Sequence, residues 1–216
     1  MKQRTLAVVS AGLSQPSSTR LLADRLAAAT GGELERLGVA AAAATTFVEA
    51  RDHAHDIVNN LLTGFPSAAL RQAIDTVTSA DGLIVVTPIF NASYSGLFKS
   101  FFDVVDDDAL AGRPVLIAAT GGSARHSLAL EHAVRPLFSY LRAVTIPTSV
   151  YAAPEDWAGA VADAGGVGAS ATGALAERIR RAAAELADLV DRHEPTKAAD
   201  PFALTTTFEE LLGGDS

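Results

Sequence analysis

Three short stretches of the sequence hold residues that could bind a phosphorylated, flat ligand. The first is rich in hydroxyl groups and stands directly before a helical pattern. Its candidate binding residues are Ser10, Ser14, Gln15, Ser17, Ser18 and Thr19. Hydroxyls and the free N–H groups of a helix start form a pocket for a phosphate. Because G-x-G-x-x-G and G-x-x-x-x-G-K-[ST] are both absent, a phosphate monoester is favoured, although a plain cluster of helix caps is an equal alternative here.

The second stretch follows the most apolar run of the chain, residues 82–87. Its candidates are Pro88, Ile89, Phe90 and Asn91. Apolar side chains suit the faces of a flat heterocycle, and an amide suits its polar edge. An ordinary strand-to-helix turn is the alternative. The nearby A-S-Y-S-G lacks the first glycine of the G-x-S-x-G nucleophile motif, and no suitably placed acid and histidine follow, so a hydrolase is disfavoured.

The third stretch pairs two glycines with a helix start, and its candidates are Thr120, Gly121, Gly122 and Ser123. Glycines let the backbone approach a ligand closely. Donors here could reach the N5 and O4 edge of a flavin, and a tight turn is the alternative. Each stretch is a weak signal by itself, but all three follow predicted strands and would meet at one crevice.

The elements that must position these stretches alternate along the chain. The pattern predicts strands over residues 5–9, 33–39, 82–87, 114–119 and 144–151. It predicts helices over residues 18–30, 53–63, 67–79, 95–105, 124–142 and 173–193, with a loop over 155–172. Strands separated by helices give an open parallel sheet covered on both faces. Such sheets bind ligands at the carboxyl ends of the strands, where the strand order reverses.

Composition excludes several classes of protein. The 216 residues suit one α/β domain, and the absence of cysteine excludes disulfides, thiolate metal sites and a cysteine nucleophile. A net charge of −8 without a basic cluster argues against nucleic-acid binding. The first apolar run is too short for a signal peptide, and no run is long enough for a membrane span, so a cytoplasmic protein is expected.

Other polar residues point to no metal site. His126 and His132 fall on different faces of one predicted helix, and the acidic run at residues 106–108 is typical of a solvated loop. Trp157 could cover a ligand. Residues 196–216 are too apolar for a free tail, and we expect them to dock on the domain of residues 1–195 or on a neighbouring subunit.

Two segments carry a family resemblance: A-D-G-L-I-V-V-T-P-I-F-N-A-S-Y-S-G-L-F-K-S-F-F-D, and then L-A-G-R-P-V-L-I-A-A-T-G-G. They resemble the NAD(P)H-dependent FMN reductases of two-component systems, whose partners are luciferase-like or alkanesulfonate monooxygenases. The similarity spans about residues 5–151. It implies a flavodoxin-like three-layer α/β/α sandwich with a five-stranded parallel sheet in the order 2-1-3-4-5.

The resemblance also implies roles for residues. The first stretch would hold the FMN phosphate, and the second and third would flank the isoalloxazine ring. Glu131 and His132 fall where alkanesulfonate-type relatives carry a π-helical bulge at a tetramer interface. The first stretch lacks the arginine that many relatives carry there. No basic residue is clearly placed for an NADPH 2′-phosphate, so the choice between NADPH and NADH stays open.

The expected reaction is hydride transfer from the nicotinamide of NAD(P)H to N5 of FMN, with no side chain needed as catalytic acid or base. Reduced FMN would then serve a flavin-dependent monooxygenase, and the enzyme is expected to be a homodimer or homotetramer. The alternatives are a quinone or azo reductase with tightly held FMN, a flavodoxin-type electron carrier, and a small-ligand or structural domain that binds no flavin.

Overall fold

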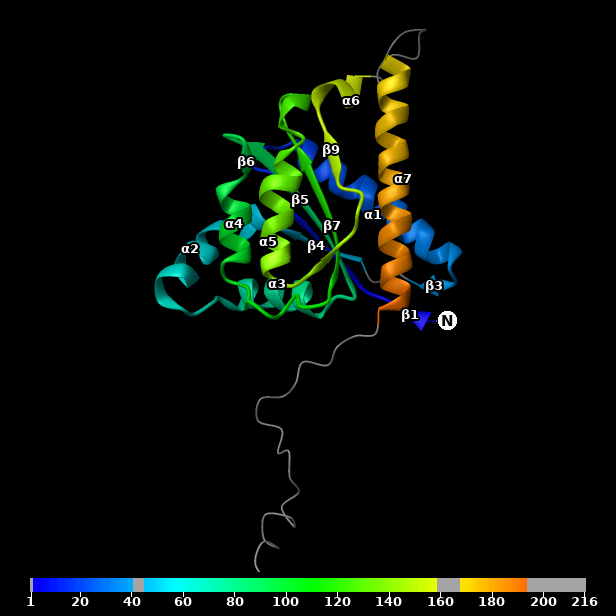
Figure 1. The fold of residues 1–216 in the computed structure, drawn as a ribbon. Coiled ribbons are helices and arrows are strands. Elements are labelled where there is room, and N and C mark those ends of the chain that lie inside the picture. Colours follow the sequence, from blue (N-terminus) through cyan, green and yellow to red (C-terminus); the bar gives the residue numbers. More distant parts are fainter. Residues whose placement is uncertain (1, 41–44, 159–167, 194–216) are drawn as a thin grey trace, which may run out of the picture.

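A parallel sheet forms the middle layer of the molecule (Figure 1). The computed structural model describes residues 2–40, 45–158 and 168–193, with side chains described for 2–40, 45–157 and 173–193. The strands of the main sheet are β2 (Leu6–Ser10), β4 (Thr45–Glu49), β5 (Gly82–Phe90), β7 (Pro114–Thr120), β8 (Val144–Thr145) and β9 (Val150–Ala152). Their order is β4-β2-β5-β7-β8, with β9 also beside β7, and all these pairs are parallel. This confirms the predicted order 2-1-3-4-5.

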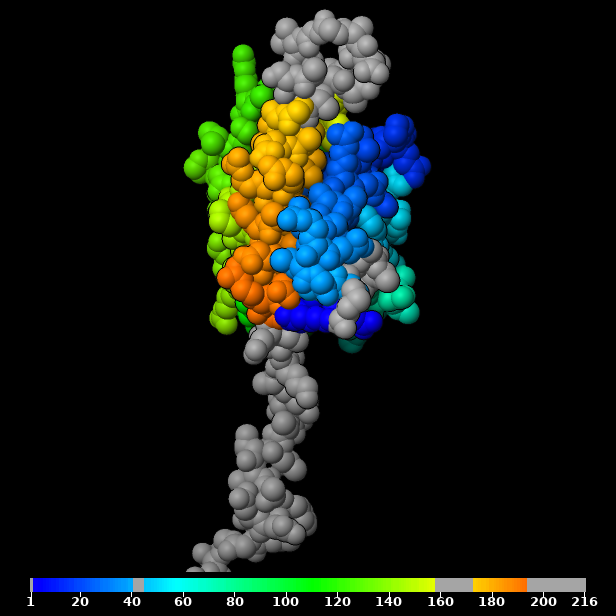
Figure 2. Space-filling view, turned by 90° about the vertical axis from the view of Figure 1, so that its right-hand side faces the viewer, coloured from blue at the N-terminus to red at the C-terminus, as the bar shows by residue number. Residues whose placement is uncertain are grey.

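Helices cover both faces of the sheet. On one face lie α1 (Ser18–Arg36) and α7 (Gly168–Arg192), which run side by side (Figure 2). The other face carries α2 (Ala54–Thr63), α3 (Ala68–Ser79), α4 (Gly96–Phe102) and α5 (Arg135–Tyr140). Short pieces complete the fold: β1 (Lys2–Gln3), β3 (Val39–Ala40), β6 (Ser93–Tyr94), η2 (Ala50–His53), η3 (Ala124–His126), the π-helix η4 (Leu130–Val134) and α6 (Pro154–Ala158).

Strand β5 contributes side chains to two separate hydrophobic clusters, because successive side chains of a strand point to opposite faces of the sheet. Ile84 and Val86 pack with the side chains of α1 and α7, whereas Leu83 and Val85 belong to the cluster on the other face. Both faces of the strand are therefore buried. This explains why its sequence is continuously apolar rather than alternating.

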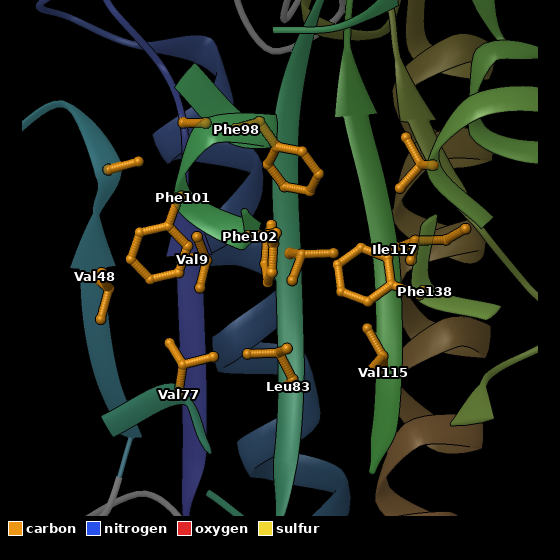
Figure 3. Close-up of a cluster of buried hydrophobic side chains, with 14 of the residues drawn as sticks. Val9, Val48, Val77, Leu83, Phe98, Phe101, Phe102, Val115, Ile117 and Phe138 are labelled. Atoms are coloured by element: carbon orange, nitrogen blue, oxygen red, sulfur yellow. The ribbon is translucent and has the colours of Figure 1, made fainter. Parts of the chain in front are cut away.

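Four phenylalanines dominate the second cluster (Figure 3). Phe98, Phe101 and Phe102 of α4 and Phe138 of α5 pack over Val9, Leu83, Val115 and Ile117 of the sheet. The ring centroids of Phe102 and Phe138 are 5.0 Å apart at 78°, an edge-to-face arrangement. Burying each such ring contributes roughly 1.5–3 kcal/mol, so this cluster fixes α4 and α5 beneath the connections that follow β5 and β7.

The strand predicted over residues 33–39 is wrong. Helix α1 continues to Arg36, and the chain turns away from the helix at Gly38, whose φ is +77°. Residues 33–36 (E-L-E-R) favour a helix, and Leu34 is buried against the sheet as part of the helical stripe. The second strand of the sheet is instead β4, which lies in the stretch that the sequence left undefined.

The strand predicted to stop before Pro88 continues to Phe90. Its neighbour β2 ends at Ser10, which lies opposite Val86, so that side of β5 is unpaired around Pro88. A proline without an N–H group is tolerated where a strand has such a free edge.

The long helix predicted over residues 124–142 is also corrected. It is divided into η3, η4 and α5, and the backbone N–H of Arg135 bonds to the carbonyl of Leu130 in the i→i−5 pattern of a π-helix. Pro136 has no N–H to continue the earlier ladder, which suits a register change at this point. The π-helix contains Glu131 and His132, as the family resemblance implied.

Two further boundaries differ from prediction. The strand of residues 144–151 is interrupted at Pro147, so it forms β8 and β9 as separate pieces. The loop predicted over 155–172 contains α6 and the start of α7. The tail, residues 196–216, lies outside the described residues.

Candidate flavin-binding site

A cavity of about 490 Å³ opens at the carboxyl ends of the central strands. It lies where the connections after β2, β5 and β7 meet, which is the switch point of the strand order. Its volume falls in the usual range for cofactor and substrate sites. Its lining residues are Leu13, Ser14, Ser18, Thr19, Pro88, Ile89, Phe90, Thr120, Gly121, Gly122, Ala152, Pro154 and Trp157.

One wall of the cavity is the start of helix α1. Ser17 caps the helix, and its hydroxyl accepts a hydrogen bond of 3.2 Å from the amide of Arg20. The amides of Ser18 and Thr19 lie in the first turn of α1, where the backbone N–H groups have no acceptor within the helix. Both residues line the cavity. The wall therefore offers N–H groups, hydroxyls and the positive end of the helix dipole, a set suited to a phosphate.

Ser10 lies at the end of β2, where this wall begins. It is fully buried, and its hydroxyl has no hydrogen-bond partner among the described residues. A buried hydroxyl without a partner costs free energy unless something bonds to it. The Ser10 side chain is not part of the cavity lining, so this hydroxyl lies behind the wall rather than on it.

The opposite wall is the hairpin of β5 and β6. Ile89 pairs with Tyr94 and Phe90 with Ser93, and Asn91 and Ala92 form the turn with φ values of +48° and +68°. The ring of Phe90 is 47% exposed although it lines the cavity. This wall presents an apolar, aromatic surface of the kind that a flat heterocycle requires.

The third connection contains two glycines that lie in different surroundings. A Cβ on Gly121 would collide with the hydroxyl of Tyr151, which donates a 2.7 Å hydrogen bond to the carbonyl of Ser123. Burial, together with the nearby Glu155 and Asp156, raises the pKa of Tyr151 and keeps its hydroxyl a donor. A Cβ on Gly122 would meet nothing, so its backbone is open to the cavity.

Nine of the predicted site residues line the cavity: Ser14, Ser18, Thr19, Pro88, Ile89, Phe90, Thr120, Gly121 and Gly122. The other five lie around it and are not lining residues. Ser10 is buried behind the wall, Ser17 and Ser123 cap helices, Asn91 forms the hairpin turn, and Gln15 faces Arg51.

The cavity is also lined by residues that were not predicted. These are Ala152 at the end of β9, Pro154 just after it, and Leu13 from the first connection. The end of β9 could have been chosen from the sequence, because it is another carboxyl end of the same sheet. Trp157, considered from the sequence as a cover, does line the cavity.

Helix α6 is held in place by ionic contacts. Asp156 accepts from the amide of Ala153 at 2.9 Å and from the Arg178 guanidinium at 2.9 Å. Arg178 also donates to the carbonyl of Tyr151 at 3.2 Å. Because α6 carries Trp157, these contacts fix the side of the cavity that Trp157 forms.

The fold and the site define a flavodoxin-like α/β protein with a ligand cavity at the switch point of its sheet. The family model for NADPH-dependent FMN reductase matches residues 4–158. The chain belongs to this family, which confirms the resemblance and the enzyme class predicted from the sequence: it is an NAD(P)H-dependent FMN reductase.

Individual relatives of the chain include proteins named as FMN reductases. A curated FMN reductase (NADPH) of Pseudomonas aeruginosa is 40% identical over 149 residues, which cover 69% of this chain and 76% of the relative. The NADH-dependent FMN reductase SfnE of Pseudomonas putida is 36% identical over 86% of this chain and 91% of its own length. The solved structure of an oxidoreductase from Corynebacterium diphtheriae is 44% identical, with a TM-score of 0.80 over 90% of this chain and 100% of that one.

Within residues 2–40, 45–158 and 168–193, no group of three or more histidines and carboxylates is placed to hold a metal ion. None of the helices in these segments is long and apolar enough to cross a membrane.

Proposed function

We propose that FMN binds in the cavity with its phosphate at the start of α1 and its ring between Phe90 and the connection at Gly121 and Gly122. The observation that carries this proposal is the division of one cavity into a wall of hydroxyls and helix amides and a wall of apolar side chains. FMN supplies the redox chemistry by accepting the hydride of NAD(P)H at N5. We propose that the nine lining residues among the fourteen predicted ones contact FMN and that the other five support these nine.

The protein's own part is binding and orientation. The amides and hydroxyls of Ser18 and Thr19 hold the phosphate, Phe90 and Ile89 contact the ring, and the backbone of Gly121 and Gly122 approaches its polar edge. No side chain is required to move a proton. We therefore assign no catalytic acid or base.

FMN is proposed to be an exchangeable substrate rather than a permanently held cofactor. The cavity is lined in part by exposed side chains, since Leu13 is 55% and Phe90 47% exposed. Such a site lets the flavin leave after reduction and reach a flavin-dependent monooxygenase. The relatives named for NADPH and for NADH use different nucleotides, so both nucleotides are proposed as donors.

A steady-state assay tests this function. Purified protein should oxidise NADPH or NADH when FMN is supplied, and flavin should be lost on dialysis. Absence of flavin-dependent turnover contradicts the function. A yellow protein that keeps FMN and turns over quinones by ping-pong kinetics would indicate the quinone reductase alternative. A stable blue semiquinone without direct NAD(P)H oxidation would indicate an electron carrier.

Self-association is part of the proposal. Leu62 and Phe65, at the end of α2 and just after it, are 80% and 81% exposed. Apolar side chains gathered in this way are typical of protein contact sites. We propose a homodimer or homotetramer, with the tail of residues 196–216 docked on this domain or on a neighbouring subunit. Light scattering of the full chain, and of the chain ending at residue 195, tests both statements.

A further inference from the structure

Arg51 reaches the first connection from a different part of the chain. It belongs to η2, which follows β4, and Glu49 at the end of β4 lies opposite Ser10 at the end of β2. The connections after these two neighbouring strands therefore start side by side. The Arg51 guanidinium donates to the carbonyl of Ser14 at 3.3 Å, and Ser14 lines the cavity.

A second contact joins Arg51 to the same connection. With its amide oxygen turned toward η2, the Gln15 side chain accepts hydrogen bonds from both terminal nitrogens of Arg51, the one from Nη1 being 3.2 Å long. Arg51 thus hydrogen-bonds to two consecutive residues, to the backbone of Ser14 and to the side chain of Gln15. The planar guanidinium suits such a two-point contact better than an ammonium would.

The charge of Arg51 is only weakly compensated. Its contacts in the first connection are neutral oxygens. Among the residues that the structure describes, it forms one ion pair, with Asp52 at 3.5 Å, and the Asp52 side chain is 65% exposed. An exposed ion pair of this kind contributes little. The positive charge of Arg51 is therefore available to an anion bound beside Ser14.

Arg20, the other cation beside this connection, is differently placed. Its guanidinium bonds to Asp24 at 2.7 Å and to Glu49 at 2.8 Å, and it lies 4.1 Å from the ring centroid of Phe47. Two carboxylates neutralise it and hold it away from the cavity lining. Of these two arginines, Arg51 is the one whose charge is available to an anion at the start of α1.

We propose that Arg51 is the residue that makes this enzyme select a flavin with a phosphate over one without. The first connection lacks an arginine of its own. Arg51 supplies one from the connection that follows the neighbouring strand β4. It acts as a positioning residue through Ser14 and Gln15 and as a source of positive charge. This inference rests on the proposed function, because it assumes that the flavin phosphate lies at the start of α1.

The test compares FMN with riboflavin, which has the same ring and no phosphate. In Arg51→Gln the KM for FMN rises about tenfold, the size expected for one charge-assisted hydrogen bond, while the KM for riboflavin stays within about twofold. Arg51→Lys keeps the charge and loses the planar fork, so it recovers part of the FMN affinity. Arg71→Gln, an equal change of charge on the exposed surface of α3, leaves both values unchanged.

Several results would overturn the proposal. These are an equal rise for both flavins, no change for either, or Arg51→Lys as weak as Arg51→Gln toward FMN. Wild-type protein that binds FMN and riboflavin equally would also overturn it. Flavin fluorescence titrations keep the two claims apart: wild type that prefers FMN in binding but shows no NAD(P)H turnover refutes the proposed function and leaves Arg51 in its role.

Discussion

The hydroxyl oxygens of Thr19 and Thr120 lie 2.8 Å apart, and both side chains are buried, although 101 positions separate them in the chain. This hydrogen bond joins the start of α1 to the end of β7. Both threonines line the cavity, so the bond connects the wall formed by the start of α1 to the connection that contains Gly121 and Gly122. Two of the three connections that line the cavity are therefore joined by a buried hydrogen bond.

The first prediction concerns this pair. Thr19→Val or Thr120→Val leaves the other hydroxyl buried without a partner, which should cost about 1–3 kcal/mol of the free energy of unfolding. The double variant should lose less than the sum of the two, because it removes both polar groups. Urea denaturation measures all three. Thr76→Val, whose hydroxyl bonds only to the carbonyl of Gln72 on exposed α3, is the control. Additive losses would show that the bond is not formed.

The second prediction concerns Gly121. Gly121→Ala places a methyl group against the hydroxyl of Tyr151, so either the third connection or the tyrosine must shift. We expect a lower Tm and a several-fold higher KM for FMN. Adding Tyr151→Phe removes the colliding oxygen and should recover part of the Tm. Gly122→Ala has open space around its new methyl group and should keep the Tm of wild type, which thermal unfolding without ligand will show.

The third prediction separates ring binding from phosphate binding. Phe90→Ala removes an aromatic side chain that is 47% exposed, so the unfolding free energy should change by less than about 1 kcal/mol. The KM values for FMN and riboflavin should both rise about tenfold, because the two flavins share the ring. Phe65→Ala, equally aromatic and 81% exposed away from the cavity lining, should leave both values unchanged. A loss confined to FMN would contradict the assignment of Phe90 to the ring wall.

The fourth prediction concerns the π-helix. Hydrogen bonds from Arg135, together with one from Ser149, hold the pKa of Glu131 below its ordinary value of 4.5. Arg135 also bonds to Thr145 at 2.8 Å and to the carbonyl of Ile146 at 3.0 Å, so Glu131 helps to fix the π-helix against the segment after β8. A carboxylate with a lowered pKa stabilises the folded state above its unfolded pKa, and the benefit disappears as the pH falls through the folded pKa.

Glu131→Gln should therefore lower the free energy of unfolding by less than about 1 kcal/mol at pH 7, since the side chain is partly exposed. The difference from wild type should shrink as the pH falls below 4.5. Urea denaturation at a series of pH values measures it, with Glu35→Gln on the exposed side of α1 as the control. A difference that stays constant with pH would mean that the ionised carboxylate is not what stabilises the π-helix.

The sequence by itself determined most strands of the sheet and the end of the sheet at which the cavity lies, and its resemblance to a known family implied the strand order. Continuous apolar runs such as residues 82–87 identify strands buried on both faces, and a parallel sheet brings the connections after its strands to one edge. The hydroxyls of Ser18 and Thr19 and the glycines at 121 and 122 could be chosen on this ground alone. Local pattern and topology were enough because the two glycines directly follow one predicted strand and the two hydroxyls start the helix after another.

Only the tertiary structure decided which residues complete the site. Arg51 reaches Ser14 because β4 lies beside β2 in register, and Trp157 reaches the cavity because Arg178 of α7 holds Asp156 of α6. The segment at 33–36 is helical because its residues favour a helix and because Leu34 is buried against the sheet, a contact that the local pattern does not reveal. Contacts between residues far apart in the chain leave no periodic signal in the sequence, so the folded arrangement alone reveals them.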